Sequence, residues 1–197
     1  MHTVVSLMEL GRTDEAIGFA TGELDRGGRL DAELAEQVAD PVVAALLLGK
    51  VAQATERGAA LRVAPTTRVG PHVFDDHDLL TLVGNLVDNA LDAALGPASG
   101  TASGPTALVE VDLRLEGSTL RLEVDDSGPG IAPADREQIV RRGWSTKSTD
   151  AVAGRGLGLA LVLQTVRRLG GRLEIGESPL GGARFCVAVG DETGGTT

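Results

Sequence analysis

Residues 108–130 read LVEVDLRLEGSTLRLEVDDSGPG, and this stretch decides the fold. On both sides of Gly117-Ser118, apolar residues alternate with charged or polar ones, which is the pattern of two half-buried strands joined by a tight turn. The second strand runs directly into Asp126-Ser127-Gly128-Pro129-Gly130, a run of turn-forming residues. The sequence therefore predicts a β-hairpin, with strands over 108–115 and 120–124 and a glycine-rich loop at its end.

Strand and helix patterns continue on both sides of this hairpin. A tract rich in Gly, Ala, Ser and Pro (residues 96–104) precedes it and predicts a flexible connection. Elements in this order favour an α+β fold, a two-layer α/β sandwich in which one mixed sheet is covered by helices on one face. The flanking segments are a short strand over 61–63, a long helix over 76–95, a helix over 155–169, and strands over 172–175 and 184–189.

The N-terminal region reads as helical with breaks. Gly11 ends the first segment as a C-cap glycine would, and Asp40-Pro41 opens another helix, since proline is tolerated at the first helical position. Two antiparallel helices of this kind form a hairpin whose apolar face needs a cover, and dimerisation is the usual remedy. We therefore expect a partial helical dimerisation hairpin over residues 1–57, a second domain over 58–190 and a flexible tail over 191–197.

Composition limits the classes of function. The chain has 197 residues, of which 42% are hydrophobic, so it can bury a core. No apolar run approaches the roughly 20 residues that a membrane span needs. The net charge of −10 argues against a nucleic-acid partner, because a phosphate backbone demands a basic face. It does not argue against ATP, because nucleotide sites use backbone N–H groups, helix N-termini and a bridging metal locally.

The predicted helix over 76–95 carries Asn85 and Asn89, which are four residues apart and therefore on one helix face. Other residues already define its apolar face, so the two amides are free to face a ligand. An amide oxygen is a neutral hard donor that suits an Mg²⁺ shell otherwise made of phosphate oxygens and water. Two helical asparagines are also common on a solvated surface, so the pair alone leaves both interpretations open.

Two glycine-rich loops are candidates for nucleotide contacts. The carboxylate of Asp126 can accept a hydrogen bond from an exocyclic amine such as adenine N6, and Gly128 and Gly130 let the backbone approach a flat ring. A plain turn is the alternative interpretation. Gly154-Arg155-Gly156-Leu157-Gly158 leads into an apolar helix, whose N-terminus offers N–H donors and a positive dipole end to a phosphate. An ordinary glycine-containing loop–helix junction is the alternative there.

The order and spacing of these three motifs resemble the N, G1 and G2 boxes of the GHKL ATPase superfamily, which contains gyrase B, histidine kinases and a mismatch-repair ATPase. The resemblance covers roughly residues 58–190. Gly181-Gly182-Ala183-Arg184-Phe185 looks like the last glycine box of the superfamily, with Ala183 where the family usually has threonine. The resemblance implies the Bergerat fold and the binding of ATP with Mg²⁺.

The resemblance also implies a role for each motif residue. Asn89 would coordinate Mg²⁺, and Asn85 would line the phosphate side. Asp126 would read adenine, with Gly128 and Gly130 as the floor of its pocket. The stretch of about residues 131–155 would form a lid over the nucleotide. The residues implied to bind phosphate are Gly154, Arg155, Gly156, Leu157 and Gly158.

One position separates kinases from hydrolases within this superfamily. In the ATP-hydrolysing members, the residue four before the metal-binding asparagine is a glutamate that activates water. This chain has Asn85 there, and an amide cannot act as a general base. We therefore expect phosphoryl transfer to another group instead of rapid hydrolysis.

Residues 142–148 (RGWSTKS) resemble the Gly-x-Ser-Thr-Lys lid of the citrate and C4-dicarboxylate sensor kinases, and residues 2–11 and 40–50 are similar to the hairpin and linker of the same group. Lys147 could reach the γ-phosphate and act in catalysis together with Asn85, whereas a solvated lid lysine is the alternative. The resemblance places the phospho-accepting histidine about two helical turns before His2, so we expect that acceptor to lie upstream of this chain.

The resemblance as a whole implies the cytoplasmic catalytic core of a two-component sensor histidine kinase. Such a core transfers the γ-phosphoryl group of ATP to a histidine, from which it passes to an aspartate of a response regulator. We expect the intact protein to be a membrane-anchored homodimer with no nucleic-acid partner. The alternatives are a serine kinase of the anti-sigma type, which the helical region at 1–57 disfavours, and a dimerisation and docking module whose nucleotide site only sets conformation.

Overall fold

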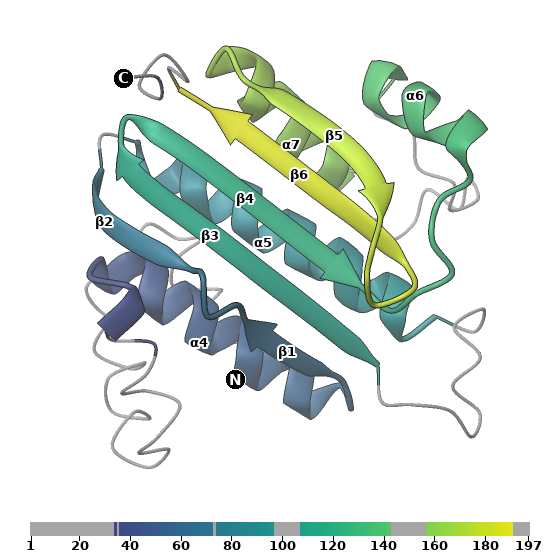
Figure 1. Ribbon diagram of the computed structural model, residues 1–197, viewed down its shortest axis with the longest axis horizontal. Coiled ribbons are helices and arrows are strands. Elements are labelled where there is room, and N and C mark those ends of the chain that lie inside the picture. Colours follow the sequence, from purple (N-terminus) through teal and green to yellow (C-terminus); the bar gives the residue numbers. More distant parts are fainter. Residues whose placement is uncertain (1–33, 35, 73, 97–106, 143–156, 191–197) are drawn as a thin grey trace.

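The computed structural model describes residues 34, 36–72, 74–96, 107–142 and 157–190, and within them six strands form one sheet (Figure 1). The strand order is β1-β3-β4-β6-β5, and β2 also pairs with β3. Strands β1 and β2 run parallel to β3, whereas all other pairs are antiparallel, so the predicted mixed sheet is confirmed. The strands are β1 (Ala60–Val63), β2 (Arg68–His72), β3 (Leu108–Gly117), β4 (Thr119–Asp126), β5 (Arg172–Glu177) and β6 (Ala183–Val189).

Three helices cover one face of this sheet. Helix α4 (Pro41–Glu56) packs on β1, α5 (Asp76–Ala94) on β3 and β4, and α7 (Leu157–Arg168) on β5 and β6 (Figure 1). A fourth helix, α6 (Pro133–Arg142), lies beside β5. Because α5 contacts both α4 and α7, it is the central helix of the layer. This two-layer arrangement is the α+β sandwich expected from the sequence. None of the described helices is long and apolar enough to cross a membrane.

Aspartates begin both long helices. The Asp40 Oδ1 accepts hydrogen bonds from the backbone N–H groups of Val42 and Val43 at 2.9 and 3.0 Å, and the predicted helix start at Asp40-Pro41 is confirmed. Asp75 caps α5 in the same way, with the N–H of His77 donating to its Oδ1 at 2.8 Å. These caps satisfy N–H groups that the first turn of a helix leaves unpaired.

The core lies between the helix layer and the β3–β4 hairpin. Every second residue of the hairpin faces α5 and is fully buried, while the residues between them carry charges on the opposite face. Helix α4 contributes to the same continuous cluster, through Val43 and Leu47 among others. The predicted boundary between residues 57 and 58 stays a prediction, and residues 1–33 lie outside the described residues. Buried residues of the hairpin are Val109, Val111, Leu113, Leu115, Leu120, Leu122 and Val124.

Two elements were not predicted from the sequence. Strand β2 contains Gly70 and Pro71, which weaken any strand pattern. Helix α6 falls within the stretch predicted as a lid, and its sequence is polar apart from a few positions such as Ile139, which is 4% exposed. The remainder of that stretch (residues 143–156), the glycine-rich connection at 97–106 and the tail from 191 lie outside the described residues.

Candidate functional site

Asp126, the last residue of β4, is surrounded by backbone N–H donors from Gly128, Gly182 and Ala183, which together form what we call the Asp126 socket. Its side chain is 2% exposed, and its Oδ1 accepts hydrogen bonds from the N–H groups of Gly128 at 2.8 Å and Ala183 at 3.2 Å. The N–H of Gly182 donates to the Asp126 backbone carbonyl at 3.0 Å. Burial raises the pKa of Asp126, and the bonds from Gly128 and Ala183 oppose that rise by stabilising the ionised form. Both bonds occupy Oδ1, and no residue in the described part of the chain donates to Oδ2.

Glycine is required at two positions of this socket. A Cβ on Gly182 would lie 2.1 Å from the Asp126 Oδ1, and a Cβ on Gly128 would lie 2.9 Å from the carbonyl group of Ala93 in α5. Neither distance is compatible with a side chain, because these neighbours belong to the backbone or to a buried, hydrogen-bonded group. The glycines therefore let two loops close on Asp126 from opposite sides.

The loop after β4 is anchored at its first residue. The Ser127 Oγ accepts from the N–H of Leu108 at 2.9 Å, and the N–H of Ser127 donates to the Leu108 carbonyl at 3.0 Å. Gly130 then adopts a positive φ of 74° and approaches the backbone of Gly182. The turn interpretation and the ligand interpretation of this loop are thus compatible, since the same turn presents the carboxylate.

Asn85 and Asn89 lie on α5, and both are half-buried. The Asn85 Nδ2 donates to the Thr81 carbonyl at 2.7 Å, which directs its Oδ1 toward α7. A Cβ on Gly158 would lie only 2.7 Å from this Oδ1, so the beginning of α7 approaches α5 at that point. The Asn89 side chain forms no hydrogen bond within the described part of the chain, and its amide is available to a ligand.

The candidate residues follow one line along α5. Ala93, which contacts Gly128, marks the end nearest Asp126; Asn89 lies one turn before it, and Asn85 one turn earlier still. From Asn85 to Ala93 the helix rises about 12 Å. The Asp126 carboxylate and Gly158 in the first turn of α7 thus lie near opposite ends of this line.

A cavity of about 490 Å³ adjoins the Asn85 end of this line, between the N-terminal part of α5 and α7. Thr81, whose carbonyl anchors Asn85, belongs to its wall. In the same cavity the Arg168 guanidinium pairs with Asp78, which is 4% exposed. Nearby, Leu157 and Leu161 of α7 expose 67% and 46% of their surface. The residues around the cavity are Asp75, His77, Asp78, Thr81, Leu161, Gln164, Thr165 and Arg168.

The structure brings together part of the predicted site. Asp126, Gly128 and Gly130 form one loop against the end of α5, and Gly158 meets Asn85. Leu157 begins α7 and is exposed. Four predicted residues lie outside the described residues: Lys147, Gly154, Arg155 and Gly156.

Sequence reasoning missed two features around Asp126. It noted Ala183 only as the residue that stands where the family usually has threonine, whereas the backbone N–H of Ala183 donates directly to the Asp126 carboxylate. It also missed the ion pair between Asp125 and Arg184 behind the socket. The glycine box at 181–185 was the available signal, but its partner depends on the pairing of β4 with β6, which a single sequence does not reveal.

A mixed sheet, a central helix with two asparagines, and a buried aspartate followed by a glycine loop define a class of nucleotide-binding domain. The chain belongs to the family of histidine kinase-, DNA gyrase B- and HSP90-like ATPases, whose model matches residues 74–193.

Among individual proteins, the chain is similar to several sensor proteins. The chain is 36% identical over 191 residues to sensor protein CitS of Halalkalibacterium halodurans, covering 96% of this chain and 34% of that protein. It is 32% identical over 181 residues to sensor histidine kinase DcuS of Escherichia coli K12, covering 91% of this chain and 31% of that protein. The fold matches the mycobacterial sensor histidine kinase MprB with a TM-score of 0.52 and 24% identity, over 74% of this chain and 93% of that one. The chain spans about a third of the length of these curated relatives.

Proposed function

We propose that this chain binds ATP with Mg²⁺ and transfers the γ-phosphoryl group to a histidine, as the catalytic core of a two-component sensor kinase. The observation that carries the proposal is the line along α5, which joins a buried carboxylate at one end to Asn85 and the start of α7 at the other. Family membership and the sensor-kinase relatives support ATP use and this class of enzyme.

At the base end, the Asp126 carboxylate accepts a hydrogen bond from the exocyclic amine of adenine. The bonds from Gly128 and Ala183 hold Oδ1 in place, and Oδ2 is available for the ligand. Gly128 and Gly130 keep the floor of the site free of side chains, so a flat ring can lie against the backbone.

At the phosphate end, the residues present fit an Mg²⁺ ion that arrives with the nucleotide. Bound Mg²⁺ neutralises phosphate charge in the transfer. Asn89 supplies an amide oxygen to this ion, because its side chain has no partner within the described part of the chain. Asn85 lines the phosphate side, with its amide oriented by Thr81. The N-terminus of α7 and the glycine run at 154–158, which extends into its first turn, would hold the phosphates, and Lys147 would neutralise charge as they react.

Transfer to another group is favoured over hydrolysis at this site. The Asn85 amide cannot remove a proton from water, and the atoms nearest to a Cβ on Gly158 all belong to Asn85, with no carboxylate among them. The cavity between α5 and α7 adjoins this end, where an acceptor must enter. We assign residues 1–57 to the helical hairpin of the kinase, with the acceptor histidine upstream, and a response-regulator receiver domain as the next partner.

A trans-phosphorylation experiment tests this function. The acceptor is a longer form of the protein that contains the upstream histidine and carries Asn89→Ala, so that it cannot phosphorylate itself. The donor is this chain with radiolabelled ATP, compared with the Asn89→Ala donor and with a Gly84→Ala donor, which changes the same helix at a position where a Cβ meets nothing within 4 Å.

The proposal predicts acid-labile, alkali-stable label with the parent and Gly84→Ala donors and none with Asn89→Ala. Acid-stable label on the acceptor would indicate a serine kinase. ATP binding without any label transfer would indicate a docking module whose nucleotide site sets conformation.

A further inference from the structure

Asp125 is an aspartate that the proposed nucleotide site does not use, although it directly precedes Asp126. Successive residues of a strand point to opposite faces, so Asp125 lies on the sheet face away from the helices. It is nevertheless only 4% exposed. Burying a carboxylate is costly unless a hydrogen-bonded or oppositely charged partner compensates for its lost hydration, so the role of Asp125 depends on its partner.

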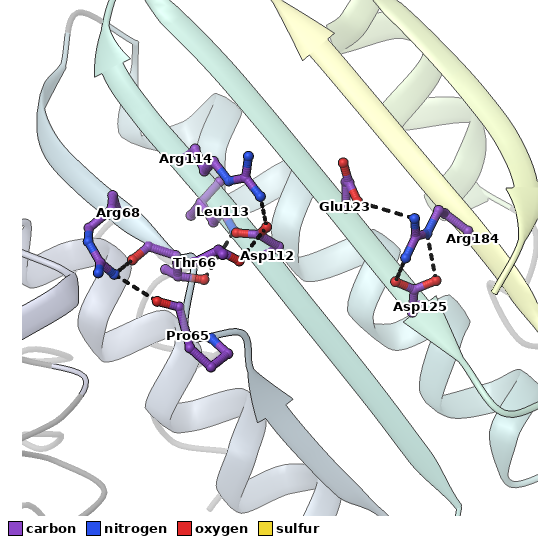
Figure 2. Close-up of polar contacts among 10 residues, drawn as sticks. Pro65, Thr66, Arg68, Asp112, Leu113, Arg114, Glu123, Asp125 and Arg184 are labelled. Atoms are coloured by element: carbon purple, nitrogen blue, oxygen red, sulfur yellow. Dashed lines mark hydrogen bonds and ion pairs between the residues drawn. The ribbon is translucent and has the colours of Figure 1, made fainter. Parts of the chain in front are cut away.

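That partner is Arg184 of β6, directly opposite Asp125 in the register of the sheet. Its Nε donates to the Asp125 Oδ1 at 2.9 Å and its Nη2 to Oδ2 at 2.7 Å, so the pair is bidentate (Figure 2). The Arg184 Nη1 also lies 3.6 Å from the Glu123 Oε2. Bidentate pairs of this kind combine charge with a fixed relative orientation of the two side chains.

The pair joins the two strands at the point where the Asp126 socket is built. Asp125 precedes Asp126, and Arg184 follows Ala183, whose N–H donates to the Asp126 Oδ1. The Asp125–Arg184 pair therefore bridges β4 and β6 on the sheet face away from the helices. The next pair, Asp126 and Ala183, closes the socket on the face toward the helices. Any change in the separation of β4 and β6 here changes the distance from Ala183 to Asp126.

The charges of these residues also connect the Asp125–Arg184 pair to Asp126. Asp125 and Asp126 are adjacent and both nearly inaccessible, and the charge of Asp125 contributes to the raised pKa of Asp126. The Arg184 guanidinium, whose own pKa is raised by its hydrogen bonds to Asp125, opposes the charge of Asp125. Without it, two buried carboxylates would repel each other at the base end of the site.

We propose that Asp125 and Arg184 form a positioning pair for Asp126, and that this pair sets how strongly the site prefers adenine over a base without a 6-amino group. The inference rests on the proposed role of Asp126 in adenine recognition. Neither residue touches the nucleotide; both act through the spacing of β4 and β6.

Arg184→Lys tests the pair, since lysine keeps the charge but loses the bidentate geometry. Affinities for ATP and inosine triphosphate are measured by calorimetry, because the base of inosine carries a 6-oxo group, an acceptor, where adenine carries the 6-amino donor. The matched control is Arg114→Lys: Arg114 pairs with Asp112 on the same sheet face, but both residues belong to β3 and bridge no strands (Figure 2). Asp126→Asn provides the reference for a site that no longer reads the amine correctly.

The expected result is a loss of ATP affinity of about tenfold in Arg184→Lys, with inosine triphosphate affinity changed less than about twofold. Arg114→Lys should keep the parent ratio. Equal weakening of both nucleotides, or an unchanged ratio in a folded variant, overturns the positioning role. If Arg184→Lys does not fold, the exchanged pair Asp125→Arg with Arg184→Asp is used. A restored ratio there supports the inference, and a folded exchange that has lost the ratio opposes it.

Failure of the proposed function gives a different result. In that case the parent chain binds no ATP, or Asp126→Asn leaves the ATP-to-inosine triphosphate ratio of the parent unchanged. A parent that discriminates and loses discrimination in Asp126→Asn, but not in Arg184→Lys, leaves the function intact and overturns only the positioning pair.

Discussion

Asp126 is buried, and yet in the proposed site it accepts a hydrogen bond from an amine, which its ionised form does more strongly than the neutral acid. Two N–H groups, those of Gly128 and Ala183, donate to its carboxylate and compensate for part of its lost hydration. The compensation is incomplete, because the pKa of Asp126 is still raised. We therefore expect nucleotide affinity to change with pH and with small steric changes around Asp126.

The pH dependence of base discrimination tests the ionisation state of Asp126. The ionised carboxylate is the stronger acceptor for the adenine amine, whereas the protonated form can donate to the 6-oxo group of inosine, so the preference for ATP over inosine triphosphate should decline as pH falls through the pKa of Asp126. Because that pKa is raised, the decline should begin above the pH at which an aspartate of the ordinary pKa of 3.8 would titrate. The ratio of the two affinities cancels the titration of the triphosphate, which both ligands share. A ratio that stays constant until the ordinary range contradicts this assignment.

The contribution of Asp126 to the free energy of unfolding should change with pH in the opposite direction to its contribution to base discrimination. An acid whose pKa is higher in the folded than in the unfolded state favours folding only while it is protonated, and that contribution is lost as pH rises through the two pKa values. At neutral pH, Asp126→Asn should therefore unfold at a temperature no lower than the parent, while ATP binds less tightly.

Gly182→Ala tests the socket sterically. The new Cβ would lie 2.1 Å from the Asp126 Oδ1, so either the carboxylate or the loop must move. We expect ATP affinity to fall at least about tenfold and stability to fall by about 1–3 kcal/mol, as in other overpacked sites. Gly176→Ala in β5 is the control, because a Cβ there meets nothing within 4 Å. Calorimetry and denaturant unfolding give the two readouts, and equal behaviour of the two variants would contradict the close fit at residue 182.

At this scale the sequence suggests as candidates the residues whose own side chain, or lack of one, carries the expected chemistry. Asp126, Gly128 and the asparagine pair fall in this group. It does not predict Ala183 or Arg184, because their contributions come from a backbone N–H and from cross-strand register. Both depend on which strands lie side by side, and single-sequence patterns carry no such information.

At the scale of elements, α5 is held between its two neighbouring helices by polar contacts. On one side the Lys50 Nζ of α4 donates to the Asp88 Oδ1 at 2.7 Å, and on the other Arg168 of α7 pairs with Asp78. Gly158 of α7 closes against Asn85 between them. The orientation of the two asparagines therefore depends on how α4 and α7 pack.

Gly158→Ala tests the approach of α7 to α5. Its Cβ would lie 2.7 Å from the Asn85 Oδ1, which must then turn away or push the helices apart. ATP affinity should fall several-fold, as measured by calorimetry. Gly84→Ala, next to Asn85 on α5, should leave binding unchanged and raise stability by roughly 0.5–1 kcal/mol, since alanine is the better helix former and the site is open. Similar binding losses in both variants would show that α5 itself is perturbed, and would contradict the specific contact.

The Lys50–Asp88 pair predicts an asymmetric response to mutation. The Lys50 side chain is 3% exposed and that of Asp88 is 45% exposed. Asp88→Ala leaves a buried ammonium with Gln53 as its remaining partner and should cost about 3 kcal/mol. Lys50→Met removes the buried charge, keeps the volume and leaves Asp88 to water, so stability should change by less than about 1 kcal/mol. Urea unfolding of the two variants measures both values, and equal losses would contradict the burial of Lys50.

Strong periodicity explains which elements the sequence predicts. The β3–β4 hairpin and α5 have clear apolar patterns and were predicted to within a few residues. Strand β2 was missed because Gly70 and Pro71 interrupt it, and it survives by pairing with β3 next to β1. Helix α6 was missed because a polar helix beside a sheet edge needs only a narrow apolar contact.

At the scale of the whole molecule, one continuous core joins α4 to the sheet and to α5 and α7. Helix α4 lies within residues 1–57, the range predicted as the helical hairpin, and its Val43 and Leu47 are almost fully buried in this core. The predicted boundary between residues 57 and 58 stays a prediction. The proposed nucleotide site lies along the central helix of the layer. In this proposal β4 and β6 form its base end, and α7 forms its phosphate end.

Asp126 and Asn89 are proposed to act at two ends of one nucleotide site. Calorimetric titration of the chain with ATP, with and without Mg²⁺, tests this arrangement when the parent is compared with Asp126→Asn and Asn89→Ala. We expect the parent to bind Mg-ATP, Asp126→Asn to weaken binding with or without the metal, and Asn89→Ala to remove most of the gain that Mg²⁺ provides. A folded parent that binds no ATP, or two folded variants that bind it as the parent does, would show that these residues form no such site.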